Sequence, residues 1–133
     1  MAYTAGESAS HVLVVAEPET TVATAARLMR DNHVGALVVI ETESPRERAV
    51  GMITDRDLVV EVMAMGLDPG TITVGDIMAT DLATVGADDS VLTAVERMRE
   101  RGVRRLPVLD AQGRVTGIVA MDDLVHLLAG GLG

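Results

Sequence analysis

The chain contains no cysteine, no lysine and no aromatic residue other than Tyr3. The lack of cysteine excludes disulfides, thiolate nucleophiles and cysteine-based zinc sites, and the lack of lysine excludes Schiff-base chemistry. Because the apolar residues are almost all aliphatic or methionine, we expect a core of valine, isoleucine, leucine, methionine and alanine. Such a core offers no buried aromatic ring to stack on a base or a sugar.

Charge and hydropathy disfavour further classes of partner. The net charge of −9 over 133 residues argues against nucleic acid or an anionic membrane as the general partner. The longest apolar run, Val34–Ile40, is far too short to cross a membrane. The start of the chain has no basic region followed by an apolar run, so no signal peptide is visible. We therefore expect a cytoplasmic protein with a core of its own.

The most informative feature that is present is an internal repeat. Thr21–Met29 is echoed by Ser90–Met98 at an offset of 69 (90 against 21), and Gly51–Leu58 by Gly117–Leu124 at an offset of 66 (117 against 51). The difference of three residues falls within Glu41–Arg48, where the first copy has a longer turn. Two packed copies of one half-domain unit create a cleft, and clefts are where ligands bind.

Hydrophobic periodicity predicts the same order of elements, β-α-β-β-α, in each half, and therefore an α/β fold of the α+β kind. The first helix shows the spacing of a buried face at Val22, Ala25, Ala26 and Met29. Helices are expected at about 21–32, 54–65 and 90–101, and a last helix runs to about 128. Strands are expected at 12–15, 34–40, 49–53, 82–85, 103–109 and 114–119. The expected organisation is a flexible arm (1–10), a first motif (11–68), a linker (69–79) and a second motif (80–133).

The junction between the strand at 49–53 and the following helix carries the best candidate site. Gly51 allows a close backbone approach, and the unpaired amides at the helix start can receive a phosphate. The Thr54 hydroxyl can bond such a ligand, and Asp57, one turn later, is a charged acceptor suited to a ribose diol. The same Thr54 and Asp57 also match a capping box, which would only stabilise the helix start. The two interpretations are compatible.

Three segments in order, Gly51–Asp57, Thr73–Met78 and Gly102–Val108, make both halves resemble the CBS motif. Together they resemble a CBS pair, or Bateman module, over about Val12–Ala129, and the chain is identified as a member of the stand-alone tandem CBS proteins. This resemblance implies two pseudo-symmetric motifs packed through their sheets. It also implies adenosine ligands in clefts between the motifs, and a flat homodimer.

Carried over by position, the resemblance implies one competent ligand site. Thr54 and Asp57 would hold phosphate and ribose, and the apolar side chains of Ile53 and Pro107 would flank the base. The residues that complete this site are Thr80, Ala83, Val103, Arg104 and Arg105. Because Arg104 and Arg105 alternate along a strand, both need not face one site. The alternative for them is a solvated edge or a salt bridge to a neighbouring carboxylate.

The second copy departs from the pattern. Ala120 replaces the threonine and removes a hydroxyl and a helix cap, although Asp123 remains. The strand residues that would line this site, Val34 and Ala36, lie in a segment with no cation. We therefore expect a second, degenerate site at Asp123, Val34 and Ala36. We expect His33 to end the preceding helix.

Other groups of polar residues give weaker support for a functional site. Acidic pairs at helix starts, such as Asp122 and Asp123, are common without any metal, and the three histidines are too dispersed for a metal site or a triad. The arginines near residue 100 alternate with Glu96 and Glu100, which favours a salt-bridged helix face over a nucleic-acid patch. We find no nucleophile–base pair, and therefore expect no enzyme and no required cofactor.

The sequence thus predicts a regulatory module that senses adenine nucleotides and acts in trans on an unknown protein target. AMP, ADP or ATP are the expected ligands, and S-adenosylmethionine or NAD(H) are less favoured. The two arginines suit a phosphorylated ligand better than S-adenosylmethionine. The alternative is a ligand-free module for dimerisation or protein interaction. Apolar helix positions could form a homodimer interface or be buried within the chain: Leu58, Val59, Val62, Leu124, Leu127 and Leu128.

Overall fold

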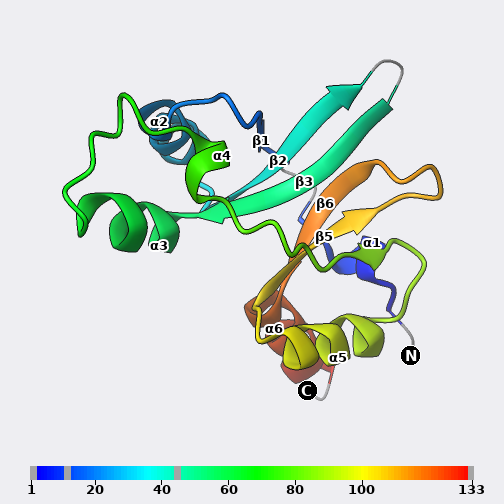
Figure 1. Ribbon diagram of the computed structural model, residues 1–133. Coiled ribbons are helices and arrows are strands. Elements are labelled where there is room, and N and C mark those ends of the chain that lie inside the picture. The colour runs from blue at the N-terminus through cyan, green and yellow to red at the C-terminus, as the bar shows by residue number, and fades with distance from the viewer. Residues whose placement is uncertain (1–2, 11–12, 44–45, 132–133) are drawn as a thin grey trace. The chain divides into compact units, whose positions relative to one another are not determined.

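The computed structural model describes residues 3–10, 13–43 and 46–131. The chain folds into two compact units, each with its own sheet and core (Figure 1). One unit is Val14–Leu82, and the other combines Met1–Leu13 with Ala83–Gly133. Within the described ranges no helix is long and apolar enough to cross a membrane.

The Val14–Leu82 unit contains a three-stranded sheet in the order β1-β2-β3, whose first pair is parallel and whose second is antiparallel. Its strands are β1 (Val15–Ala16), β2 (Ala36–Glu43) and β3 (Arg46–Thr54). Its helices are α2 (Val22–Asn32), α3 (Asp55–Asp57), which continues as the π-helix η1 (Leu58–Met63), and α4 (Val74–Ile77). The buried core is aliphatic and includes Ala25, Met29, Leu37, Val39 and Ile53.

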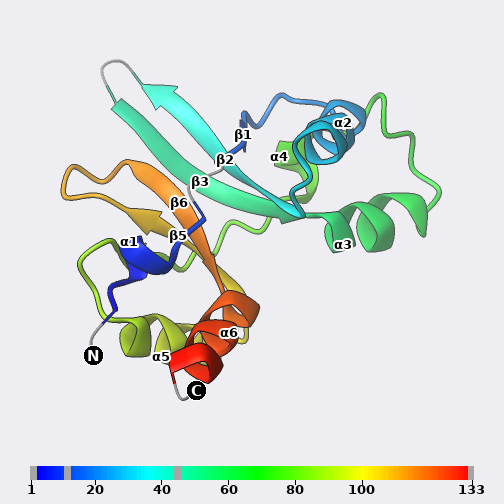
Figure 2. The same ribbon diagram turned by 180° about the vertical axis from the view of Figure 1, so that it is seen from behind.

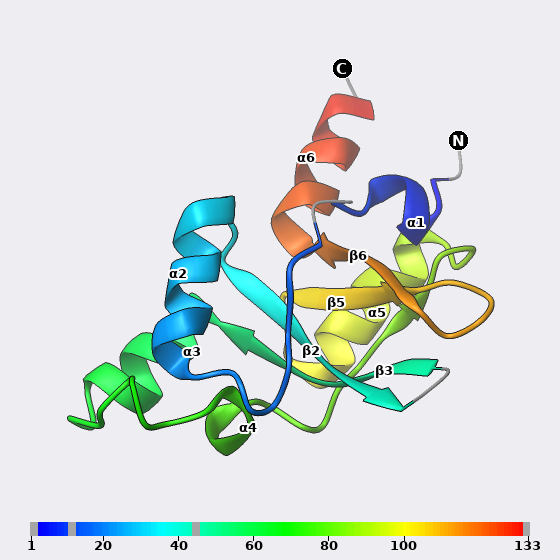
Figure 3. The same cartoon turned by 90° about the horizontal axis from the view of Figure 1, so that it is seen from above.

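The other unit repeats this plan with a sheet in the order β4-β5-β6. Its strands are β4 (Val85–Gly86), β5 (Arg105–Leu109) and β6 (Val115–Ala120). Its helices are α1 (Ala5–Ser8), α5 (Val91–Arg101) and α6 (Met121–Gly131). Helices α3 and α6 continue directly from β3 and β6 (Figures 1 and 3). The core combines Ala5 and Ala9 with Met98, Leu106 and Val119.

The strand registers confirm the repeat and the α+β fold expected from the sequence. Ala36 lies opposite Thr54 in one sheet, and Arg105 lies opposite Ala120 in the other. Each antiparallel pair has a register shift at the same place, between Val39 and Ile40 or between Val108 and Leu109. The longer first copy extends its hairpin beyond this shift, as the extra residues in Glu41–Arg48 predict.

Helix starts follow from local sequence in both repeats. The Thr21 hydroxyl accepts from the Thr24 N–H at 3.2 Å before α2, and the Ser90 hydroxyl accepts from the Thr93 N–H at 3.1 Å before α5. The apolar stripe of α2 agrees with prediction except at Ala26, which is exposed. The stripe is therefore narrower than its spacing suggested.

Helices α2 and α5 end alike, with a residue in the left-handed conformation. His33 has φ 53° and Gly102 has φ 65°. The His33 N–H donates to the Met29 and Arg30 carbonyls, so this histidine ends the helix as expected. Glycine adopts this conformation without the steric cost that a side chain adds.

The N-terminal residues differ from the flexible arm that we expected. Residues 5–8 form α1, whose start is capped by the Thr4 hydroxyl accepting from the Glu7 N–H at 3.1 Å. Ala5 is fully buried, and Ser10 forms an antiparallel bridge with Ile118. In Figures 1 and 2, α1 lies beside β6 and α5, with which it is in contact. Burial of small residues fixes this segment in place.

Residues 4–7 are the counterpart of residues 73–76 in the other unit. Thr73 and Asp76 form a capping box before α4, and the Thr73 N–H lowers the pKa of the Asp76 carboxyl. The stabilisation that the ionised Asp76 gives to the helix start is therefore fully present above the ordinary aspartate pKa. It is lost as the pH falls through the lowered pKa. The N–H of Gly6 donates to Ala87 O at 2.9 Å, as that of Gly75 does to Pro18 O at 2.8 Å. Each unit thus has a similar helical turn.

Replacement of Gly6 by alanine tests whether the N-terminal segment belongs to the fold. A Cβ at Gly6 would lie 2.9 Å from the Ala87 carbonyl oxygen, and one at Gly75 would lie 3.0 Å from that of Pro18. We expect Gly6→Ala and Gly75→Ala each to lower the free energy of unfolding by about 1–3 kcal/mol, measured by urea denaturation. The exposed Ser10→Ala serves as the control and should be within about 0.5 kcal/mol of wild type. A silent Gly6→Ala would contradict the packed segment.

The two left-handed helix ends give a second prediction of opposite signs. His33→Gly should raise the free energy of unfolding by about 0.5 kcal/mol, because relief of steric strain exceeds the added freedom of the unfolded chain. Gly102→Ala should lower it by about 1 kcal/mol for the same reason. Thermal and urea denaturation of both variants measure the effect, and equal signs would rule out this account of the helix ends.

Candidate functional site

The strand-to-helix junction at Thr54 holds the strongest candidate residues. The Thr54 hydroxyl accepts from the Asp57 N–H at 3.2 Å, and Asp57 Oδ2 accepts from the Thr54 N–H at 2.9 Å. The capping box considered from the sequence is therefore present. The capping box uses Oδ2 of Asp57 and uses the Thr54 hydroxyl oxygen as an acceptor. In the described part of the chain, Asp57 Oδ1 and the hydroxyl proton have no partner, so the cap orients both groups and leaves them able to bind a ligand.

Other predicted site residues gather at the same end of the Val14–Leu82 unit. Ala36 lies opposite Thr54 in the sheet, and the Gly35 carbonyl accepts from the Asp55 N–H at 2.9 Å. Met52 and Ala79 form an antiparallel bridge, which places the exposed Thr80 next in the chain. Val34, just before this strand, is half-buried. This unit therefore carries residues of both predicted sites.

Ile53 and Pro107 are placed differently from our expectation that they flank a base. Both side chains are fully buried, and Ile53 belongs to the core of its unit. A side chain enclosed in a core is not free to contact a ligand without repacking. Their contribution is to hold the strands beside Thr54 and Arg105.

The arginines lie at the start of β5 in the other unit. Arg104 is exposed and donates to Asp122 Oδ1, and its carbonyl accepts from the Met121 N–H at 2.8 Å. The salt bridge foreseen as the alternative for Arg104 thus exists. Arg105 is half-buried, and its guanidinium has no hydrogen-bond or ion-pair partner among the described residues. Exposed ion pairs contribute about 0–1 kcal/mol, so Arg104 can exchange Asp122 for a phosphate at little cost.

The strand-to-helix junction of the other repeat, where Asp123 of the second predicted site lies, has no threonine hydroxyl. Ala120 occupies the register position opposite Arg105 that Thr54 occupies opposite Ala36. Alanine offers no hydroxyl to the first turn of α6, and Asp123 is exposed there. Val103, the counterpart of Val34, is 38% exposed. Each unit therefore has one half of the features that the sequence predicted together: a capped carboxylate in one, two arginines in the other.

Sequence reasoning missed two structural features near these sites. The first is the equivalence of residues 4–7 in one repeat to residues 73–76 in the other, which the shared threonine, glycine and acidic residue at an offset of 69 could have revealed. The second is the contact of Arg97 with the Thr84 carbonyl at 2.8 Å, for which no sequence pattern exists. Among the described residues no group of three or more side chains is arranged to hold a metal ion.

Comparison with protein families gives a match in each half of the chain. A family model described as CBS domain matches residues 7–64 and 74–130. Hypoxic response protein 1 of Mycobacterium tuberculosis is 38% identical over 117 residues, which are 88% of this chain and 78% of that protein. The protein MK0525 of Methanopyrus kandleri is 34% identical over 122 residues, 92% of this chain. The chain spans only 61% of the length of MK0525.

Solved structures show the same fold. The crystal structure of Hypoxic Response Protein I with two coordinated zinc ions has a TM-score of 0.76 and 33% identity, covering 94% of this chain and 98% of that one. The CBS domain pair of protein MJ0100, in complex with 5′-methylthioadenosine and S-adenosylmethionine, has a TM-score of 0.85 at 22% identity. That likeness covers 98% of this chain and 99% of the other.

Restoring the missing hydroxyl tests the asymmetry of the two helix starts. Ala120→Thr should let Asp123 complete a capping box and raise the free energy of unfolding by about 1 kcal/mol. Ala120→Val has nearly the same shape without the hydroxyl, so it should not give this gain. Urea denaturation of both variants measures the difference, and equal effects would assign the change to packing.

Proposed function

This chain belongs to the CBS domain family, and from that we propose that it is a regulatory CBS pair that binds an adenine nucleotide and acts on a separate partner protein. The observation that supports this most is the helix start at Thr54. Its cap leaves a carboxylate oxygen and a hydroxyl proton available, and the equivalent position in the other repeat is Ala120. A cap needed only for the fold would serve both repeats equally.

We propose that the ligand is held by the residues that remain accessible. Asp57 would accept hydrogen bonds from the ribose diol, and the Thr54 hydroxyl would donate to a phosphate. Arg104 and Arg105 would supply positive charge for phosphates, because guanidinium groups bind phosphate oxygens in paired hydrogen bonds. The other proposed contacts are Thr80, Ala83 and Val103. Asp123, Val34 and Ala36 would form a second site without a phosphate grip.

The choice of an adenosine ligand rests on chemistry and on family. The two arginines favour a phosphorylated ligand such as AMP, ADP or ATP over S-adenosylmethionine, which has no phosphate. The MJ0100 pair, which shares the fold, holds two adenosine derivatives, so S-adenosylmethionine belongs in any ligand panel. We propose no catalytic role, because the candidate residues include no nucleophile beside a base.

A ligand-free interaction module is the second candidate, and exposed apolar side chains favour it. Val59 is 52% exposed, Met63 74% and Met65 68%. Such side chains can form the interface of a homodimer, which we propose in either case. Of the interface residues expected from the sequence, Val62 and Leu124 are instead buried in their own units. The Leu128 side chain lies outside the described residues.

Calorimetric titration with AMP, ADP, ATP, S-adenosylmethionine and NADH tests the proposed function. We expect about one phosphorylated ligand to bind per chain. Asp57→Ala should weaken binding at least about tenfold, because a hydrogen bond to a charged group is lost. Asp123→Ala is the matched control, at the equivalent position of the other repeat, and should change affinity less than about twofold.

Two further variants separate the cap from the ligand contact. Asp57→Asn keeps an acceptor for the Thr54 N–H but removes the charge. It should therefore lower the free energy of ligand binding by more than it lowers the free energy of unfolding. Thr54→Ser keeps the hydroxyl and should retain binding. Absence of heat with every ligand, from a folded wild-type protein, would reject the nucleotide proposal and favour the ligand-free module.

A further inference from the structure

The segment that leads into β4 has no regular structure of its own. Residues 82–84 form neither helix nor strand, and β4 that follows consists only of Val85–Gly86. Ala83 in this segment is one of the proposed ligand contacts. A segment outside helices and strands lacks their regular hydrogen bonds, so a ligand that binds it gains affinity when other contacts already hold the backbone in place.

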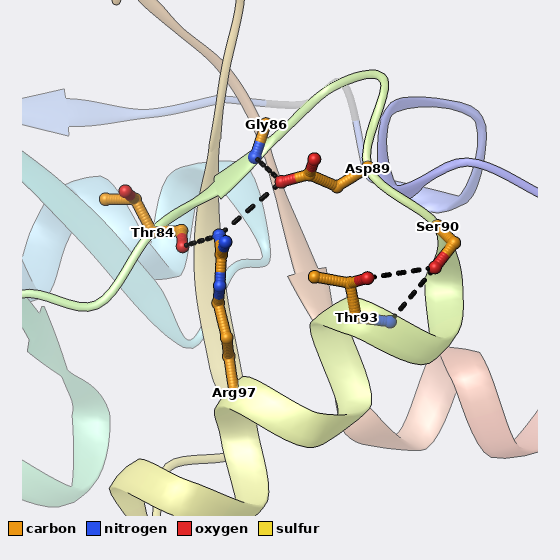
Figure 4. A network of polar contacts seen from close by, with 6 residues as sticks. All are labelled: Thr84, Gly86, Asp89, Ser90, Thr93 and Arg97. Carbon is orange, nitrogen blue, oxygen red and sulfur yellow. Dashed lines mark hydrogen bonds and ion pairs between the residues drawn. The ribbon is translucent and has the colours of Figure 1, made fainter.

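Arg97 provides such a restraint from helix α5. Its Nη1 donates to the Thr84 carbonyl oxygen at 2.8 Å and lies 3.5 Å from Asp89 Oδ2. The same Oδ2 accepts from the Gly86 N–H at 2.9 Å. Figure 4 shows Arg97 extending from the helix toward both the Thr84 carbonyl and the Asp89 carboxylate. One guanidinium thus connects the helix, the residue after Ala83 and the turn that follows β4.

The other repeat folds without this restraint. Leu28 stands at the position of Arg97 and packs against the core of its unit. Thr20 stands at the position of Asp89, and its hydroxyl accepts from the Glu17 N–H at 3.1 Å, which closes the same turn. An arginine is therefore not required for this local fold. It occurs in the repeat that also carries Ala83, Arg104 and Arg105 of the proposed competent site.

We propose that Arg97 is a positioning residue for ligand binding, which holds the Thr84 carbonyl so that the backbone at Ala83 is ordered before the ligand arrives. This inference rests on the proposed nucleotide function. Arg97 touches no ligand in this account, so its effect is independent of the number of phosphates. A direct phosphate contact would instead increase in importance from AMP to ATP.

The experiment compares Arg97→Leu, which introduces the residue of the other repeat, with wild type in titrations with AMP and with ATP. We expect Kd to rise about five- to tenfold, by the same factor for both ligands. Arg99→Leu is the control, because it removes an exposed charge from the same helix; it should change Kd less than about twofold. Arg97→Lys should recover part of the affinity, since an ammonium can still donate to the Thr84 carbonyl.

The outcomes are distinguishable. A wild type that binds and an Arg97→Leu variant that binds equally well would overturn the role of Arg97 alone. The role of Arg97 would also be overturned if its variant raised Kd no more than Arg99→Leu does, or if the rise in Kd grew with the number of phosphates. A wild type that binds no ligand would overturn the proposed function and this inference together. Should Arg97→Leu fail to fold, Asp89→Asn removes the charge partner but keeps an acceptor for Gly86, and a rise in Kd of about two- to threefold is expected.

Discussion

Backbone bridges beside Gly51 and Gly117 attach a distant part of the chain to each sheet. Met52 and Ala79 exchange hydrogen bonds of 3.3 and 3.2 Å, and Ser10 and Ile118 exchange bonds of 2.9 and 3.2 Å. A Cβ at Gly51 would lie 2.8 Å from the Ala79 carbonyl oxygen, and one at Gly117 would lie 2.6 Å from that of Ser10. Only glycine allows these backbones to come so close. Without the bridges, Ala79, which follows α4, would lose its place beside β3, and Ser10, which follows α1, would lose its place beside β6.

The same junctions decide where polar groups can act. Because each strand runs directly into a helix, the last strand residue becomes the helix cap, and its side chain lies at the end of the sheet. In one repeat that residue is Thr54, and in the other it is Ala120. The neighbouring strand begins with Ala36 in the first case and Arg105 in the second. One fold therefore presents a capped carboxylate in one copy and a cationic strand start in the other.

Several features could be predicted from the sequence because they are local or periodic. The repeat, the order of elements, the longer turn in Glu41–Arg48 and the cap formed by Thr54 and Asp57 depend on residues close in sequence. The burial of Ile53 and Pro107 could not be predicted in this way. Both lie on strands, and only the packing of helices against a strand decides which of its faces is enclosed. The packing of Ala5 was missed because a short polar segment gives no periodic signal.

Pattern and composition along the chain are enough to identify the family, the two-fold repetition and the residue types available for chemistry. Other features depend on tertiary packing: residues 4–10 complete the second repeat, Arg104 pairs with Asp122, and Arg97 holds the Thr84 carbonyl. Each of these contacts joins residues separated by many positions. Such contacts follow from the packing of strands and helices, which brings together side chains and carbonyls that no spacing along the chain relates.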